Sequence, residues 1–138
     1  MMIPIRPSIT LAAIAMPVLA TAALPPIATL RWHKRVVLIA APDANDPSAS
    51  EQRAILAAWH QGAEDRDIAV VEIAGSAVSG AGDAAPALRR RYRLEPARFT
   101  VLLIGKDGQV AVRADRPIAA DRLQRVIDAM PMRRAGER

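Results

Sequence analysis

The chain has 138 residues, 19 of them basic and 14 acidic, and it has no cysteine. That length holds one domain of roughly 100 residues with a single core once an N-terminal leader is removed. Apolar residues make up 51% of the chain and aromatic residues 3%, so the core must be built from Ala, Val, Leu and Ile. Without cysteine the protein has no disulfide and no thiol nucleophile of its own.

The N-terminal stretch has the pattern of a secretory signal. Residues 1–7 carry one positive charge, Arg6, and the most apolar part follows at 9–19. Ala20-Thr21-Ala22 is the small-x-small pattern that signal peptidase accepts, so cleavage is predicted after Ala22 or Ala23. We therefore predict that residues 1–22 are a signal peptide and that the protein is periplasmic or secreted.

An uncleaved membrane anchor is the alternative reading of this stretch. Residues 8–30 are uncharged and long enough to span a bilayer. Pro17, Pro25 and Pro26 oppose one continuous helix of that length. We therefore expect no stable membrane insertion after cleavage, and we interpret residues 23–34 as a linker and lead-in.

The next segment has the pattern strand, helix, strand. Residues 36–41 are a continuous apolar run with β-branched members, which predicts a strand buried on both faces. After the loop at 42–47, Ser48 and Glu51 form a capping box that predicts a helix to about residue 62. Its buried face is predicted to hold Ile55, Leu56 and Trp59, and residues 68–74 form the second predicted strand.

The second half continues after a flexible loop at 75–82. Asp83 is predicted to cap a short helix with Pro86 in its first turn. Residues 99–104 form a third apolar strand, and Asp107-Gly108 predicts a tight turn into an antiparallel strand at 110–113. The last predicted helix is amphipathic, ends at Pro131 and has apolar residues at Leu123, Val126, Ile127 and Met130.

The element order β-α-β, α-β-β-α predicts an α/β fold. Two strands joined through a helix must be parallel, whereas the Asp-Gly hairpin is antiparallel. The pattern indicates a thioredoxin-like three-layer sandwich, in which a mixed four-stranded sheet has helices on both faces. We place this domain at 35–130, followed by a basic tail at 131–138.

The sequence also resembles a known family. The matching residues are Arg31-Trp32 with Arg35, Ala41-Pro42, Gln52, Glu64, Arg66-Asp67, Phe99, the segment 103–108 and, most specific of all, the segment 127–133. They resemble a peroxiredoxin-like domain-of-unknown-function family of bacterial exported proteins (the P-DUDES type). The same domain is found in sushi-repeat-containing extracellular proteins of animals. The match covers about residues 30–134.

The resemblance implies a thioredoxin-like fold and an exported location, and an oxidoreductase role has been suggested for the family by fold analogy. One departure is visible. The family pattern after the Asp-Gly turn resembles Gly-Val-Lys-Leu-Arg, whereas this chain has Val110-Ala111-Val112 before Arg113. This chain therefore departs from the family at that lysine.

In a thioredoxin-like fold the reactive thiol lies between the first strand and the first helix, where the helix dipole stabilises a thiolate. Here that segment is 42–48, which has aspartates and no sulfur, and Arg98-Phe99 stands where the fold usually has a cis-proline. We therefore predict no catalytic residues. We expect the surface at Pro42, Asp43, Arg98 and Phe99 to contact an extended peptide or a partner.

The same loop and the helix start after it offer two alternatives, a hydroxyl nucleophile and a metal site. Ser48 and Ser50 lack a neighbouring base, and capping explains Ser48 without chemistry. Asp43, Asn45 and Asp46 offer oxygen ligands, but their spacing lacks the Gly and distal Glu of a calcium loop, and these residues are common turn formers. We predict no metal and no cofactor.

The densest charge cluster is Arg89-Arg90-Arg91, which is a candidate anion contact or a solvated helix face. The excess of basic residues favours an acidic ligand or an envelope protein as partner, and export excludes nucleic acid. We predict a non-catalytic binding or structural module. The alternative is a peroxiredoxin-related oxidoreductase that acts with a cysteine-bearing partner.

Overall fold

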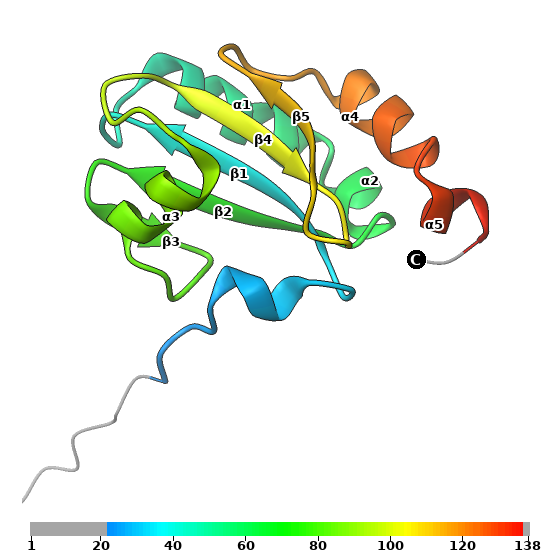
Figure 1. Cartoon of the computed structure of the whole chain (residues 1–138). Helices are drawn as coiled ribbons and strands as arrows, with labels where there is room; N and C mark the ends of the chain where they lie inside the picture. The colour runs from blue at the N-terminus through cyan, green and yellow to red at the C-terminus, as the bar shows by residue number, and fades with distance from the viewer. Residues whose placement is uncertain (1–21, 137–138) are drawn as a thin grey trace, which may run out of the picture.

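The structure, a computed structural model, describes residues 22–136. Residues 1–21, on which the predicted signal peptide falls, lie outside the described residues. The elements are η1 Ile27–Leu30, β1 Arg35–Ala41, α1 Pro47–Ala58, α2 His60–Glu64, β2 Ile68–Ala74, β3 Ala77–Ser79, α3 Ala85–Tyr92, β4 Thr100–Ile104, β5 Val110–Ala114, α4 Ala120–Asp128 and α5 Pro131–Arg134 (Figure 1).

The strands form one mixed sheet in the order β3-β2-β1-β4-β5. β1 is central and pairs in parallel with β2 and antiparallel with β4. β5 pairs antiparallel with β4 after the Asp107-Gly108 turn. The parallel first pair and the antiparallel hairpin are therefore confirmed.

The predicted strand count of four is wrong, because the sheet has five strands. The additional strand, β3, lies inside the segment 75–82 that was predicted to be a loop. Gly75 lies in the turn between β2 and β3, where its φ of +60° lets the chain turn back sharply. Gly80, with φ of +84°, follows β3 at a place where a Cβ would collide with the backbone of Val70 in β2. Only three residues of β3 pair with β2, and so short a segment gives no detectable alternation.

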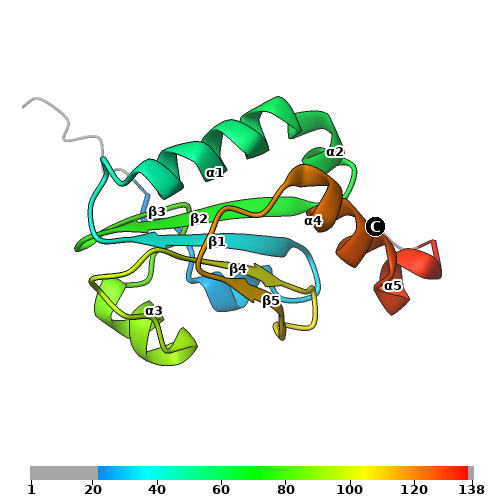
Figure 2. The ribbon, with the colours of Figure 1, turned by 90° about the horizontal axis from the view of Figure 1, so that it is seen from above.

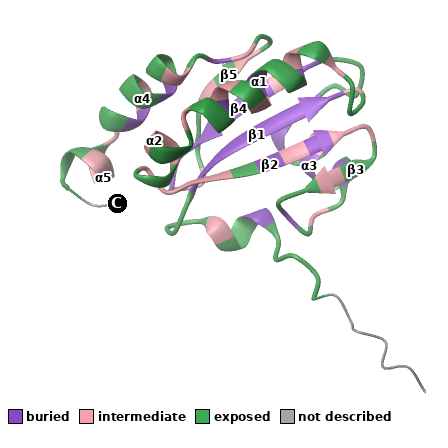
Figure 3. Ribbon diagram, turned by 180° about the vertical axis from the view of Figure 1, so that it is seen from behind, coloured by how far each residue is buried: buried purple, intermediate pink, exposed green. Residues whose placement is uncertain are grey.

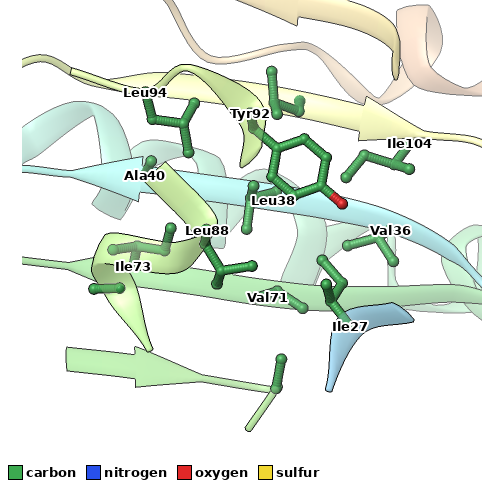
Figure 4. Packing of buried hydrophobic residues seen from close by; sticks show 13 residues of the cluster. Ile27, Val36, Leu38, Ala40, Val71, Ile73, Leu88, Tyr92, Leu94 and Ile104 are labelled. Carbon is green, nitrogen blue, oxygen red and sulfur yellow. The ribbon is translucent and has the colours of Figure 1, made fainter. Parts of the chain in front are cut away.

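Helices cover both faces of the sheet (Figure 2). Alternate side chains of β1 enter two different cores, as the pleat of a strand requires. On one face, α3 and η1 pack through Leu88, Tyr92 and Ile27 onto the sheet (Figure 4). On the other face, Leu56 from α1 and Ile127 from α4 pack onto it. All seven residues of β1 are buried (Figure 3), and all but the first, Arg35, form the uninterrupted apolar run at 36–41.

Local details differ from the predicted helix boundaries. Asp46, not Ser48, caps α1, because its Oδ1 accepts the N–H of Ala49 at 3.0 Å and Pro47 occupies the first turn. Asp83 does not cap α3; its Oδ2 accepts the N–H of Ile27 at 2.6 Å. Part of the predicted basic tail is helical, since α5 begins at Pro131.

A buried glutamine attaches the C-terminal half to the first helix. Gln52 is fully buried in α1. Its Nε2 donates to the carbonyl of Ile118 at 3.1 Å, and its Oε1 accepts the N–H of Ile118 at 2.7 Å. These two hydrogen bonds satisfy both backbone groups of a buried residue just before α4 and hold α4 against the sheet. Among residues 22–136, no helix is long and apolar enough to cross a membrane.

Candidate functional site

One end of the sheet has a cleft of about 390 Å³. This end lies where β1 begins and β4 finishes, on the side of α5 (Figure 1). The cleft is bounded by the β4–β5 turn and by the segment that joins α4 to α5. The lining residues used below are Trp32, Arg35, Lys106, Asp107, Met130 and Met132. We call this feature the Trp32 cleft.

Arg35 lies at the base of the Trp32 cleft and is only 1% exposed. It is the first residue of β1, and its backbone N–H donates to the carbonyl of Asp67 at 2.9 Å. Its Nη1 donates to the carbonyl of Arg66 at 2.8 Å, whereas its buried Nε has no hydrogen-bond partner among residues 22–136. Burial, with the nearby charge of Arg133, lowers the pKa of this guanidinium.

A second buried cation, Lys106, lines the same cleft as Arg35. Lys106 is 5% exposed, and its Nζ donates to Asp67 Oδ2 at 3.0 Å. Lys34 Nζ lies 3.8 Å from the other carboxylate oxygen. Burial raises the pKa of Asp67, but the hydrogen bond and charge of Lys106, with the charges of Lys34 and Arg35, outweigh burial and hold that pKa below its usual range. Asp67 is therefore an ionised carboxylate shared among several cations.

A third group of charges fixes the position of α4 and α5. Arg66 donates from Nε and Nη2 to the two carboxylate oxygens of Asp128, both at 3.0 Å. Arg133 Nε lies 3.6 Å from the same carboxylate, and its Nη1 donates to the carbonyl of Asp65. The hydrogen bond from Arg66 is the main reason that the pKa of Asp128 is lowered. This fork joins the start of β2 to the end of α4.

Among the interacting charged side chains at this end, cations outnumber carboxylates. Five cationic side chains meet two paired carboxylates there, namely Lys34, Arg35, Arg66, Lys106 and Arg133 with Asp67 and Asp128. A further carboxylate, Asp107, is exposed on the cleft rim, where its Oδ1 accepts the N–H of Gln109 at 3.0 Å. Of the charged residues that line the cleft itself, the two cations Arg35 and Lys106 outnumber the single carboxylate, Asp107, so the lining is positive overall.

Trp32 forms an exposed apolar wall of the cleft. Its side chain is 56% exposed, and its backbone has φ of +69°, a conformation that a bulky residue rarely adopts. The backbone N–H of Trp32 donates to the carbonyl of Lys106 at 2.6 Å, which fixes this turn against the end of β4. Arg31 lies over the indole ring at 5.0 Å. Met130 and Met132 line the same cleft, so its walls are apolar above a cationic base.

The predicted partner surface lies at the opposite end of β1. Pro42 follows β1 and Phe99 precedes β4, and these two strands pair between Ala40 and Thr100. Arg98 and Phe99 line a separate depression that does not include Pro42 or Asp43. Asp43 is exposed. The predicted residues therefore share one end of the sheet without forming one pocket.

The chemistry of this second end is that of turns and packing. Asp43 Oδ1 accepts the N–H of Asn45 at 2.8 Å, as in an Asx turn. Phe99 is a core residue, and Arg98 is 77% exposed and pairs with Glu95 at 3.1 Å. Among the described residues, no three His, Asp or Glu side chains gather closely enough to hold a metal ion.

The three arginines of α3 point in different directions. Arg89 turns inward, and its Nη2 donates to the carbonyls of Gly75 at 2.9 Å and Ala41 at 3.4 Å. Arg91 lies over the ring of Tyr92 at 5.4 Å, and Arg90 is exposed. The anion contact that was predicted from these adjacent arginines therefore does not converge on one point within the described residues.

Sequence reasoning did not single out Arg35 or Lys106 as functional residues. Both flank apolar runs, because Arg35 immediately precedes residues 36–41 and Lys106 follows residues 100–104 after one glycine. A charge at the end of a buried strand usually reaches solvent. A charge next to an apolar run could have drawn attention to these two residues. Only the fold shows that both are buried near Asp67.

Comparison with known proteins gives one family. The family model described as "Domain of unknown function (DUF4174)" matches residues 26–136. Neither curated proteins nor solved structures gave a match. The matched segment includes η1, all five strands and the whole Trp32 cleft.

Proposed function

This chain belongs to that family of unknown function, and we propose that it is an exported, thioredoxin-like domain that binds a partner without catalysing a reaction. We further propose that the Trp32 cleft is where the partner binds. The observation that carries the proposal is a half-exposed tryptophan above a buried, electropositive base in a cleft of about 390 Å³. Binding sites are typically concave and mostly apolar, with a few polar groups that orient the ligand.

The strand arrangement supports the thioredoxin-like part of the proposal. A central strand with a parallel neighbour reached through a helix, and an antiparallel neighbour continued by a hairpin and a helix, is typical of that fold. Here β1, β2, β4 and β5 with α1 and α4 have this arrangement. β3 and α3 lie between the two halves of the pattern. A fold by itself does not identify an activity.

We propose that the protein has no catalytic activity, because the residues after β1 lack a nucleophile. A thiol nucleophile would lie in segment 42–48, which has no sulfur and whose aspartates serve a turn and a helix cap. A serine nucleophile there needs a neighbouring base. The two histidines, His33 and His60, lie before β1 and in α2.

Location and partner remain part of the proposal. The pattern of residues 1–22 supports export to the periplasm or beyond. The excess of basic residues favours an acidic ligand or an envelope protein. The positive base of the Trp32 cleft supports the same choice, because it attracts a negatively charged group.

The test compares three single variants in capture from an envelope extract. Trp32→Asn removes the indole, and asparagine tolerates the left-handed backbone at this position. Arg90→Ala and Arg98→Ala change exposed residues at the two surfaces predicted from sequence. We expect a partner that is retained by the wild type and by both arginine variants and lost from Trp32→Asn. Retention by Trp32→Asn with loss from Arg98→Ala would contradict the assignment.

The non-catalytic part has its own assay. The purified protein is incubated with a small disulfide and, separately, with a peroxide in the presence of dithiothreitol. We expect the rate with the protein to equal the rate of the blank. Turnover above the blank that scales with protein concentration would show catalysis and overturn this part of the proposal.

A further inference from the structure

The buried guanidinium of Arg35 has no carboxylate of its own. Among residues 22–136 it makes no ion pair, and its Nε has no hydrogen-bond partner. The nearby carboxylate of Asp67 is bonded to Lys106 at 3.0 Å. A buried charge is costly unless it is paired and its donors are satisfied. An anion that reached Arg35 would relieve that cost.

Access of this anion to Arg35 depends on the walls of the cleft. Arg35 contributes to the lining, but only 1% of it is exposed and its Nε is closed off from solvent, so a carboxylate reaches the guanidinium only when the walls of the cleft move aside. A planar carboxylate matches the fork of a guanidinium. Met130 and Met132 are unbranched and adapt to a ligand more easily than branched side chains do.

The walls of the Trp32 cleft indicate the chemistry of the rest of the ligand. Trp32, Met130 and Met132 are apolar or aromatic, and they lie above the cationic base. A ligand that fills the cleft therefore needs an apolar body beside its charge. A cleft of about 390 Å³ accommodates a body of the size of a phenyl group.

We propose that the Trp32 cleft binds a carboxylate attached to an apolar group, with the carboxylate directed at Arg35 and the apolar group against Trp32 and the two methionines. This inference rests on the proposed binding function and names the chemistry of its ligand. Two sources carry this chemistry, namely a small free acid and the C-terminal residue of an envelope protein.

The experiment uses phenylacetate and its neutral isostere phenylacetamide on the isotopically labelled protein. The chain has two tryptophans, so its indole N–H resonances report separately on Trp32 in the cleft and on Trp59, which lies over Arg66 outside it. We expect phenylacetate to shift the Trp32 resonance saturably, at least tenfold more tightly than phenylacetamide, and to leave Trp59 nearly unchanged. Equal affinity for the acid and the amide, or no saturable shift with the acid, would overturn the inference.

A matched pair of variants tests the charge without touching buried Arg35. Met132→Glu places a carboxylate on the half-buried cleft wall, and Met132→Gln places an uncharged group of the same length there. We expect Met132→Glu to bind phenylacetate at least tenfold more weakly than Met132→Gln. Equal affinities in the two variants would overturn the charge assignment.

A third arm separates the two sources. A short acetylated peptide that ends in a free phenylalanine carboxylate is compared with its C-terminal amide and with phenylacetate. Tighter binding of the free-acid peptide than of phenylacetate identifies a protein C-terminus, and weaker binding identifies a small free acid. Failure of all these probes, with a partner still captured through Trp32, would refute the ligand class and leave the binding function standing.

Discussion

The two ends of the central strand β1 hold their charged residues in opposite ways. At the start of β1, the cations Arg35 and Lys106 are buried, and the carboxylate of Asp67 accepts a hydrogen bond from Lys106 but none from Arg35. At its far end, about 20 Å away along the strand, the aspartates of the loop are used as backbone acceptors in a turn and a cap. The half-buried Arg89 at that end donates from Nη2 to two backbone carbonyls, and its Nη1 has no partner among the described residues. A buried cation without a carboxylate therefore indicates a binding site more strongly than a charge-rich loop does.

The largest expected effect comes from Asp67→Asn. Asparagine keeps the side-chain shape and tolerates the φ of +50° at this position, so the substitution removes mainly the charge. Lys106 then stays buried without the carboxylate that pairs with it, and Arg35 loses a nearby negative charge. We expect the free energy of unfolding at neutral pH to fall by about 3 kcal/mol, measured by urea denaturation.

The matched control is the same substitution at the other end. Asp43→Asn keeps an acceptor for the N–H of Asn45 at an exposed position, so we expect a change within about 0.5 kcal/mol. A loss at Asp43→Asn equal to that at Asp67→Asn would remove the difference between the two ends.

The next largest effect concerns how α4 is held over the cleft end. Gln52→Met keeps the volume of the buried side chain but leaves the N–H and the carbonyl of Ile118 unpaired. We expect the free energy of unfolding to fall by about 2 kcal/mol. Gln124→Met on the exposed face of α4 is the control and should change it little. Equal losses would show that the bonds to Ile118 contribute nothing specific.

A smaller effect is the dependence of stability on pH. The pKa of Asp128 is lowered mainly by the hydrogen bond from Arg66, and the pKa of Asp67 is lowered by Lys106 and its neighbours in spite of burial. A lowered pKa contributes stability that is fully present above the unfolded-chain value of about 4. That stability is lost as the pH falls through the folded-state value.

We therefore expect the free energy of unfolding to fall steadily as the pH is lowered from about 5 to 3. Urea denaturation at several pH values measures this slope. Asp128→Asn should flatten it, because one of the two carboxylates with a lowered pKa is gone. A wild type whose stability is constant over that range would contradict the assignment.

The smallest effect on stability is expected at Trp32. Its side chain is 56% exposed, and Trp32→Asn relieves the left-handed backbone, so the free energy of unfolding should change by less than about 0.5 kcal/mol. Thermal unfolding measures this change. A large loss of stability would instead identify Trp32 as a packing residue and would weaken its assignment to binding.

Much of the fold is predictable because local signals agree with it. The apolar run at 36–41 predicts a doubly buried strand, and the Asp107-Gly108 turn predicts a hairpin. β3 was missed because its pairing depends on two glycines with positive φ and on only three residues. A strand of that kind is determined by its neighbour and not by its own periodicity.

The candidate site was less predictable because it depends on long-range packing. Arg89 was expected on a helix surface, but its guanidinium turns to the carbonyls of Ala41 and Gly75, which lie far from it in sequence. Arg35, Asp67 and Lys106 are likewise brought together only when β1 pairs with β2 and β4. No pattern in the sequence predicts that these three distant charged residues come together at one end of the sheet.

The most direct test of the account is a map of backbone amide shifts during a phenylacetate titration of the wild-type protein. The account predicts saturable shifts around Trp32, Lys106 and Met132, which surround the cleft at the start of β1. It predicts no comparable shifts around Asp43 or Phe99. Saturable shifts concentrated around Asp43 and Phe99, with none around Trp32, would contradict the claim that the Arg35 end of the sheet is the binding end.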